Sequence, residues 1–254
     1  MHSERQVILV ARKKIVFVIV EGPSDDEVIG TMLSRILDKN EVYVQIIHGD
    51  ITTQNGVTNS NILAKIGTIV QNYAKNNHFK KSDFKEVIHI VDMDGAYIGD
   101  EHILEDKDAV NPIYSLVNIK SDDKSKIISR NIQKSGILDK LSCCKTVWST
   151  IPYSCYYMSC NLDHVFYNKM NSSNEDKERD AIRFVKEYKD KIDEFIFFIT
   201  KSDFSVVNGY RESWEYIKQD LHSLERNTNF GLYFLTNAEC LEVAKKLQRK
   251  RTDK

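Results

Sequence analysis

The feature that most constrains this chain is an uninterrupted apolar run that stops at a charged residue. Residues 15–20 are six consecutive apolar amino acids, mostly β-branched or aromatic, and Glu21-Gly22-Pro23 follows directly. A run of this length and composition predicts a strand buried on both faces, which is typical of a parallel sheet covered by helices on each side. The chain is therefore expected to adopt an α/β fold with Glu21 at the carboxyl end of its first strand.

A helix is expected to begin immediately after this strand. Ser24 and Glu27 have the spacing of a capping box, and apolar residues then recur with a helical period up to residue 37. In strand-turn-helix units of this type, ligands collect at the carboxyl edge of the sheet. Glu21 is expected at that edge, although a glutamate that only terminates the strand or pairs with a lysine would give the same pattern.

A second acidic segment ends another apolar run. Residues 86–91 predict a strand, and Asp92 and Asp94 follow with one residue between them. Because side chains at i and i+2 of an extended chain point to the same side, the two aspartates can present their carboxylates to one ion. With Glu21 they predict an oxygen-rich site suited to Mg²⁺ or Mn²⁺, since clustered carboxylates repel one another unless a cation balances them.

The order of these two motifs resembles the TOPRIM fold, the catalytic core of type IA and II topoisomerases, bacterial-type primases and OLD-family nucleases. Those proteins carry Glu-Gly at a strand end with an acidic residue three positions after the glycine, then Asp-x-Asp at the end of a later strand. Glu21-Gly22, Asp25 and Asp92-Met93-Asp94 match this pattern within residues 13–100. The resemblance implies a TOPRIM-like parallel sheet flanked by helices, with Glu21, Asp92 and Asp94 holding Mg²⁺ (or Mn²⁺) for phosphoryl transfer.

Further acidic residues are candidates for the same metal site. Asp25 follows the Glu-Gly pair, and Asp163 lies in the first turn of a short helix expected near residue 162. The larger TOPRIM nucleases place an additional acid after the core, which implies Asp163 as a second metal ligand. Alternatively, Asp163 is present only because the positive end of the helix dipole favours an acid in the first turn. Asp50, after a strand predicted over residues 42–47, either joins the acids or ends that strand.

Three basic residues are candidates for contact with a phosphate. Lys201 follows an apolar helical stretch and can approach a scissile phosphate, whereas Lys13 and Lys14 precede the first strand and can bind substrate. The whole chain has 36 Lys and Arg against 37 Asp and Glu, so net charge neither favours nor excludes nucleic acid. A phosphate-binding surface would have to come from local clustering.

Cysteine usage and motif content limit the location and the partners. Five cysteines without a Cys-x-x-Cys pair, and no secretory signal pattern, predict a reduced, cytoplasmic protein. A zinc site of Cys155, Cys160 and His164 has less support, because structural zinc uses close ligand pairs. No apolar stretch is long enough for a membrane span. No Gly-x-x-x-x-Gly-Lys loop occurs, so an ATPase would be a separate protein.

The chain is predicted to comprise a TOPRIM-like α/β core over residues 1–155, with an insertion at about 97–145, and a mainly helical region over 156–254. The resemblance to small stand-alone or OLD-family-like TOPRIM nucleases implies a Mg-dependent endonuclease acting on DNA or RNA. It allows a toxic effector in anti-phage or abortive-infection defence, a separate ATPase or sensor partner, and a homo-oligomer.

Two alternatives to a nuclease stay open at the level of sequence. One is a non-catalytic TOPRIM module that binds nucleic acid or protein. The other is an aspartate-based phosphohydrolase, which the form Asp92-Met93-Asp94-Gly95 suggests. The haloacid-dehalogenase family places that motif on its first strand, whereas an entire strand-helix-strand-helix precedes it here.

Overall fold

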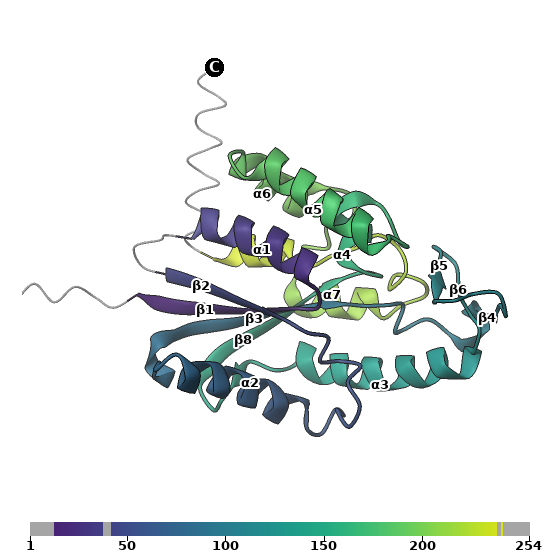
Figure 1. Cartoon of the computed structure of the whole chain (residues 1–254), viewed down its shortest axis with the longest axis horizontal. Coiled ribbons are helices and arrows are strands. Elements are labelled where there is room, and N and C mark those ends of the chain that lie inside the picture. The colour runs from purple at the N-terminus through teal and green to yellow at the C-terminus, as the bar shows by residue number, and fades with distance from the viewer. Residues whose placement is uncertain (1–12, 38–41, 238–239, 241–254) are drawn as a thin grey trace, which may run out of the picture.

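The computed structural model describes residues 13–37, 42–237 and 240. Its centre is a five-stranded sheet in the order β2-β1-β3-β8-β7 (Figure 1). The first four strands in this order run parallel, and β7 joins β8 in the antiparallel sense. The bounds are β1 Lys14–Val20, β2 Val42–His48, β3 Phe84–Asp92, β7 Thr146–Val147 and β8 Ile151–Met158. The expected α/β class and mostly parallel sheet are confirmed.

Helices cover both faces of the sheet because the apolar side chains of β1 point alternately to each side. Residues 15–20 are at most 2% exposed. The even-numbered ones pack with α1 (Pro23–Ile36), α5 (Asn174–Tyr188) and α6 (Ile192–Lys201). The odd-numbered ones pack with α2 (Ile62–Asn76) and α3 (Lys124–Ser142). Figure 1 shows these two layers above and below the sheet. Each buried apolar side chain contributes roughly 1.5–3 kcal/mol to this core.

The segment between β3 and β8 adds a small second sheet and the long helix α3. The small sheet has the order β4-β6-β5, with β4 Ile103–Glu105, β5 Ile113–Tyr114 and β6 Ile119–Ser121. Two 3₁₀ turns, Lys81–Asp83 and Asp100–His102, precede β3 and β4. Figure 1 places the small sheet at one end of the molecule, beyond the carboxyl edge of the central sheet.

Short helices after β8 return to the central sheet. Their bounds are α4 Leu162–Tyr167, α7 Tyr210–Ile217 and α8 Gly231–Thr236. Phe234 of α8 joins the apolar layer of α1, whereas Trp214 of α7 joins the layer of α2 and α3. Residues 241–254 of the predicted helical region lie outside the described residues. In the part of the chain that the structure describes, no helix has the length and apolar character needed to cross a membrane.

The helix after β1 begins with a different cap from the one the sequence predicts. Gly22 is the N-cap residue and Pro23 is the first helical residue, a position that suits proline because its missing N–H would have no partner there. Asp25 Oδ2 accepts a hydrogen bond from the Gly22 backbone N at 2.9 Å. The expected capping box of Ser24 and Glu27 is therefore wrong. Gly22 and Asp25 take these two positions instead, with Asp25 as the third helical residue.

The β-branched and aromatic residues of segment 146–151 predict a strand that Pro152 ends, and the structure divides this strand. Trp148 and Ser149 have positive φ angles of 46° and 70°, so the chain turns between β7 and β8. The longer strand β8 then begins at Ile151 and includes Pro152, which was expected to end it. Pro152 is tolerated because it is the second residue of the strand and pairs with the short edge strand β7.

Candidate active site

Three carboxylates lie at the carboxyl edge of the central sheet. Glu21 follows β1, Asp92 ends β3, and Asp50 comes two residues after β2. Because β2, β1 and β3 are parallel neighbours, their carboxyl ends meet at one edge. Glu21 Oε1 accepts a hydrogen bond from the Asp92 backbone N at 3.1 Å. The sheet thus places Glu21 beside Asp92 although 71 positions separate them.

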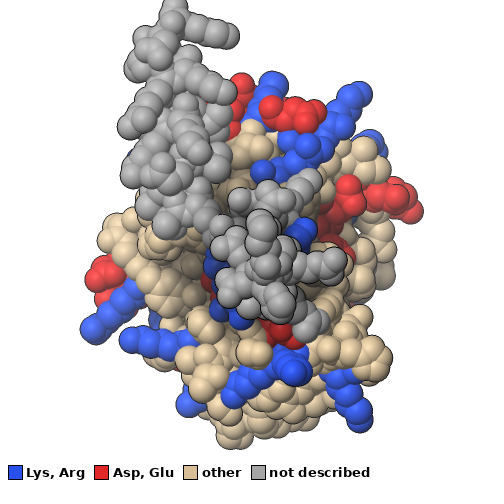
Figure 2. Space-filling view, turned by 90° about the vertical axis from the view of Figure 1, so that its left-hand side faces the viewer, with Lys and Arg blue, Asp and Glu red and all other residues tan. Residues whose placement is uncertain are grey.

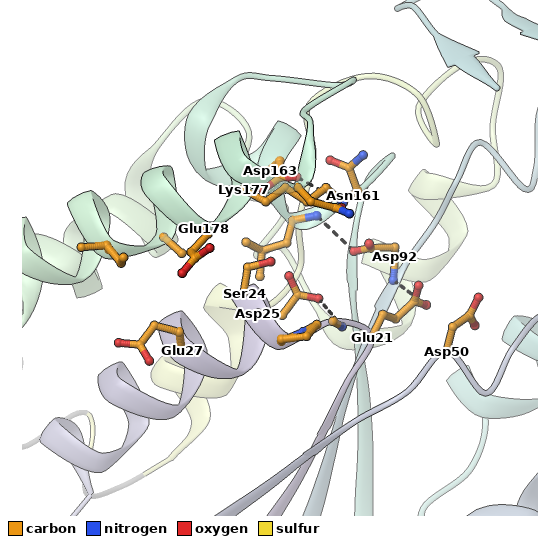
Figure 3. Close-up of a pocket in the computed structure, with 16 residues that line it drawn as sticks. Glu21, Ser24, Asp25, Glu27, Asp50, Asp92, Asn161, Asp163, Lys177 and Glu178 are labelled. Carbon is orange, nitrogen blue, oxygen red and sulfur yellow. Dashed lines mark hydrogen bonds and ion pairs between the residues drawn. The ribbon is translucent and has the colours of Figure 1, made fainter. Parts of the chain in front are cut away.

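This edge opens into a pocket of about 830 Å³ between the N-terminal ends of α1 and α5 (Figure 3). The pocket is strongly acidic. Lys177 of α5 is its one basic lining residue among those the structure describes. The carboxylates that line it are seven in number: Glu21, Asp25, Glu27, Asp50, Asp92, Asp163 and Glu178.

Asp163 enters this pocket from the first turn of α4. Asn161 caps that helix, since its side-chain oxygen accepts a hydrogen bond from the His164 backbone N at 2.9 Å. The Asp163 side chain is only 4% exposed, and its Oδ2 lies 3.5 Å from Lys177 Nζ. Its Oδ1 is buried with no hydrogen-bond partner among the described residues. One oxygen of this carboxylate is therefore buried without a partner in the described part of the chain.

Asp92 connects the two groups of acids. Its Oδ1 accepts a hydrogen bond from the Leu162 backbone N at 3.0 Å, so the start of α4 is attached to the end of β3. Figure 3 shows Asp92 between Glu21 on one side and the pair of Asp163 and Lys177 on the other. The second group of acids therefore extends the first.

Asp94 has a different environment from Asp92. It adopts a left-handed backbone conformation with φ of 49°, and Gly95 follows with φ of 67°, so the extended-chain argument for a shared direction does not apply. The Asp94 carboxylate forms an ion pair with Lys134 of α3, and Asp94 does not line the pocket. Arg130 Nη2 donates to the Asp94 carbonyl oxygen at 2.7 Å and holds the turn.

Lys134 is the residue that sequence reasoning missed. Its side chain is 0% exposed, and its Nζ lies 3.4 Å from Glu21 Oε1 as well as against Asp94. A signal for it exists in the sequence, because Lys134 stands at helical spacing between the buried residues Ile127 and Leu141 of α3. A lysine on the apolar face of a helix requires an anionic partner, since an unpaired buried charge is costly.

Burial sets the protonation of the acids. It raises the pKa of Glu21 to about 8, although Lys134 opposes this effect. Burial and then the neighbouring Glu21 raise the pKa of Asp92 well above its ordinary value. Asp25 has its pKa raised to about 6, again chiefly by burial. These carboxylates therefore lack enough positive charge around them to ionise as free carboxylates do.

For Lys134 and Asp50, neighbouring charges and hydrogen bonds outweigh burial, so both groups stay in their charged form. Burial would lower the pKa of Lys134, but Asp94, Glu21 and Asp50 outweigh it and raise that pKa, so Lys134 stays charged. Burial would raise the pKa of Asp50, yet the charge of Lys134 and hydrogen bonds from two threonines hold it below the ordinary value. Thr52 Oγ1 donates one of these bonds to Asp50 at 2.9 Å.

The residues fit a hard divalent cation in type and in charge. Carboxylate oxygens are the ligands that Mg²⁺ prefers, and acids outnumber lysines around the pocket. The unpartnered Oδ1 of Asp163 and the raised pKa of Asp92 both indicate missing positive charge. As the described side chains stand, no three His, Cys, Asp or Glu residues surround a metal position. Binding an ion would therefore require carboxylates to rotate.

The predicted basic residues lie away from this pocket. Lys13 and Lys14 are at the start of β1, about 20 Å from its carboxyl end for a strand of seven residues. Lys14 Nζ donates to the Ser82 carbonyl oxygen at 2.5 Å. Figure 2 faces the end of the molecule where β1 begins, and basic and acidic side chains are interspersed around its rim. Lys201, the last residue of α6, is exposed and does not line the pocket.

Comparisons with protein-family models, with curated proteins and with solved structures give no match for this chain.

Proposed function

We propose that this protein is a divalent-cation-dependent nuclease with a TOPRIM-like core, which hydrolyses phosphodiester bonds of DNA or RNA. The observation that supports it most directly is the position of Glu21 beside Asp92, at the carboxyl ends of two parallel neighbouring strands and inside a pocket. The Glu-Gly turn that begins α1 and the Asp-x-Asp segment after β3 support the TOPRIM resemblance.

The metal-binding residues of this proposal are Glu21 and Asp92, with Asp25 of α1 and Asp163 of α4 as further ligands. A bound Mg²⁺ or Mn²⁺ would polarise the phosphate and stabilise the leaving oxygen. Asp94 has a supporting role in this arrangement, because it holds Lys134 rather than facing the pocket.

The chain's own residues can move the proton and orient the phosphate. Glu21, whose pKa burial raises to about 8 in the metal-free protein, can accept a proton from an attacking water once it ionises, at or above about pH 8. Lys134 does not line the pocket, and its ion pair with Glu21 holds the Glu21 side chain in place from beneath. Lys177 is 38% exposed, so its ammonium group can reach a phosphate oxygen while it stays near Asp163.

The test is cation-dependent cleavage by the purified protein and by an Asp92→Asn variant. With Mg²⁺ or Mn²⁺ we expect cleavage of DNA or RNA that EDTA abolishes. Asp92→Asn should lower the rate by more than about a hundredfold, beyond the roughly 10–100-fold effect of losing an outer-shell partner of a metal. Exposed Asp108, in the segment before β5, provides the control variant Asp108→Asn, which should retain the full rate.

A thermal shift separates loss of metal from loss of fold. Mg²⁺ should raise the melting temperature of the wild type and of Asp108→Asn but not of Asp92→Asn, since a ligand that binds only the folded state stabilises it. Cleavage by Asp92→Asn at the wild-type rate would point to a contaminating nuclease and remove the proposal.

A second function is favoured by one specific observation. Lys134 already provides positive charge to Glu21 and Asp94 without any metal, as expected for a non-catalytic module that binds nucleic acid or protein. In that case the protein would bind an oligonucleotide equally well with EDTA and with Mg²⁺, Asp92→Asn would bind as the wild type does, and no cleavage would be detected.

A further inference from the structure

The acids of the proposed site lie inside a pocket of the size used for small ligands. Its volume of about 830 Å³ falls within the roughly 300–1,000 Å³ typical of small-molecule pockets. Asp25 and Asp163 are 9% and 3% exposed, so both lie below the molecular surface. The N-terminal ends of α1 and α5 form opposite walls around them (Figure 3). A phosphate must enter between these helices to reach the acids.

The depth of Asp25 and Asp163 disfavours a rigid duplex. Its phosphates are spaced along the outside of a wide double helix, and the whole helix would have to approach for one phosphate to lie between α1 and α5. A single strand is narrower and flexible, so one phosphodiester with its sugar and base can enter the pocket alone. The walls of the pocket therefore favour a single strand over a duplex.

The charge of the lining leads to the same conclusion. Duplex DNA carries one negative charge per roughly 1.7 Å of its axis, and proteins that follow it place lysine and arginine along its backbone. Here seven carboxylates and one lysine line the pocket among the described residues. Neighbouring phosphates of a duplex would be held against acidic walls, whereas a flexible strand can turn its other phosphates away.

The pocket also offers an apolar surface for a base or a sugar. Pro23 of α1 and Ala181 and Ile182 of α5 line it together with the acids. Ile182 is 56% exposed, so its side chain offers apolar area inside the pocket. A base lying on this side chain would cover it.

We propose that the pocket accepts a single-stranded nucleic acid or an unpaired strand end, and that the protein does not cleave within a duplex. This inference depends on the proposed nuclease function. Asp163, a lining residue whose buried Oδ1 has no hydrogen-bond partner among the described residues, is independent support for a ligand at this position.

The experiment compares three labelled substrates of one sequence: a single strand, a blunt duplex, and a duplex with an unpaired overhang. With Mn²⁺ we expect the single strand to be cleaved at least about tenfold faster than the blunt duplex, with cuts in the third substrate confined to the overhang. Equal rates on the single strand and the blunt duplex would overturn the inference and leave the nuclease function intact.

Bis(p-nitrophenyl) phosphate tests the chemistry without strand geometry. If neither this small diester nor any oligonucleotide is hydrolysed, the nuclease proposal fails, and fluorescence anisotropy with the same oligonucleotides decides the inference. Selective binding of the single strand supports it, and equal binding of single strand and duplex overturns it.

A matched pair of variants locates the contact. Ile182→Glu should lower single-strand cleavage roughly tenfold, the effect of losing about one good apolar contact. Ile132→Glu alters an isoleucine of α3 that is 69% exposed and outside the pocket lining, and it should have no effect. Equal effects of the two substitutions would contradict a base-binding surface at Ile182.

Discussion

The charge balance beneath the pocket can be tested by removing Lys134. Its side chain is 0% exposed and pairs with Asp94 and, at 3.4 Å, with Glu21. Lys134→Met keeps the length of the side chain but leaves the Glu21 and Asp94 carboxylates, which are 13% and 22% exposed, without that cation. Breaking a buried ion pair by removing one partner costs about 3–5 kcal/mol. Because domains are stable by only about 5–15 kcal/mol, this is a large fraction of the total.

The loss should depend on pH in a defined direction. Lys134 lowers the pKa of Glu21, so in the variant Glu21 either keeps its proton or carries a charge without its cation, and the loss should grow as the pH rises toward and above about 8. Near pH 5 Glu21 holds its proton with or without Lys134, so the loss should be smaller. Urea unfolding followed by circular dichroism at both pH values measures the difference.

Two further variants make the result specific. Lys126→Met removes a lysine of the same helix that is 72% exposed, and its free energy of unfolding should change by less than about 1 kcal/mol. Lys134→Met combined with Asp94→Asn removes the cation and its closest anion together and should recover part of the loss. A loss below about 1 kcal/mol for Lys134→Met at pH 8, or an equal loss at both pH values, would refute this account of Lys134.

Two other predictions follow from the same region. In the metal-free protein, burial raises the pKa of Glu21 from 4.5 to about 8, so between these values the folded state binds more protons than the unfolded state. Stability should therefore fall by up to a few kcal/mol as the pH rises through this window, and Glu21→Gln should flatten the dependence of melting temperature on pH; an unchanged slope would contradict the assignment. At Gly95, with φ of 67°, an added Cβ would lie 2.7 Å from Leu224 Cδ2, so Gly95→Ala should lower the free energy of unfolding by more than about 1 kcal/mol. Gly136→Ala is the control: an added Cβ on this glycine of α3 would make only an ordinary contact, 3.9 Å from Asn59 Nδ2, so the change should be neutral or stabilising in the same urea titration.

The sequence predicts the sheet edge well because its information is local. The apolar run of β1 ends where Glu21 begins, and β3 ends at Asp92. Once the strands are parallel neighbours, the meeting of their carboxylates follows without further knowledge of the fold. The prediction succeeds where strand order alone determines position.

The sequence does not predict features that depend on contacts between distant segments. The left-handed turn at Asp94 is held by Arg130, 36 positions later. The spacing of Asp92 and Asp94 alone therefore could not predict that their side chains point in different directions. Lys134 meets Glu21 across 113 positions, and Lys177 reaches Asp163 only because α5 packs over α1. The predicted strand over residues 146–151 is wrong for another reason. The chain turns at Trp148 and Ser149, and no glycine or proline marks that turn in the sequence.

The two walls of the pocket come from opposite parts of the chain, and this has a consequence for its biosynthesis. Glu21, Asp50 and Asp92 leave the ribosome long before Asp163 and Lys177. At roughly 5–20 residues per second, a nascent chain has its sheet edge for several seconds before the helix that faces it is made. The pocket is complete only once α5 has been made, so a product that terminates before α5 would carry the acids of the sheet edge without the wall that faces them.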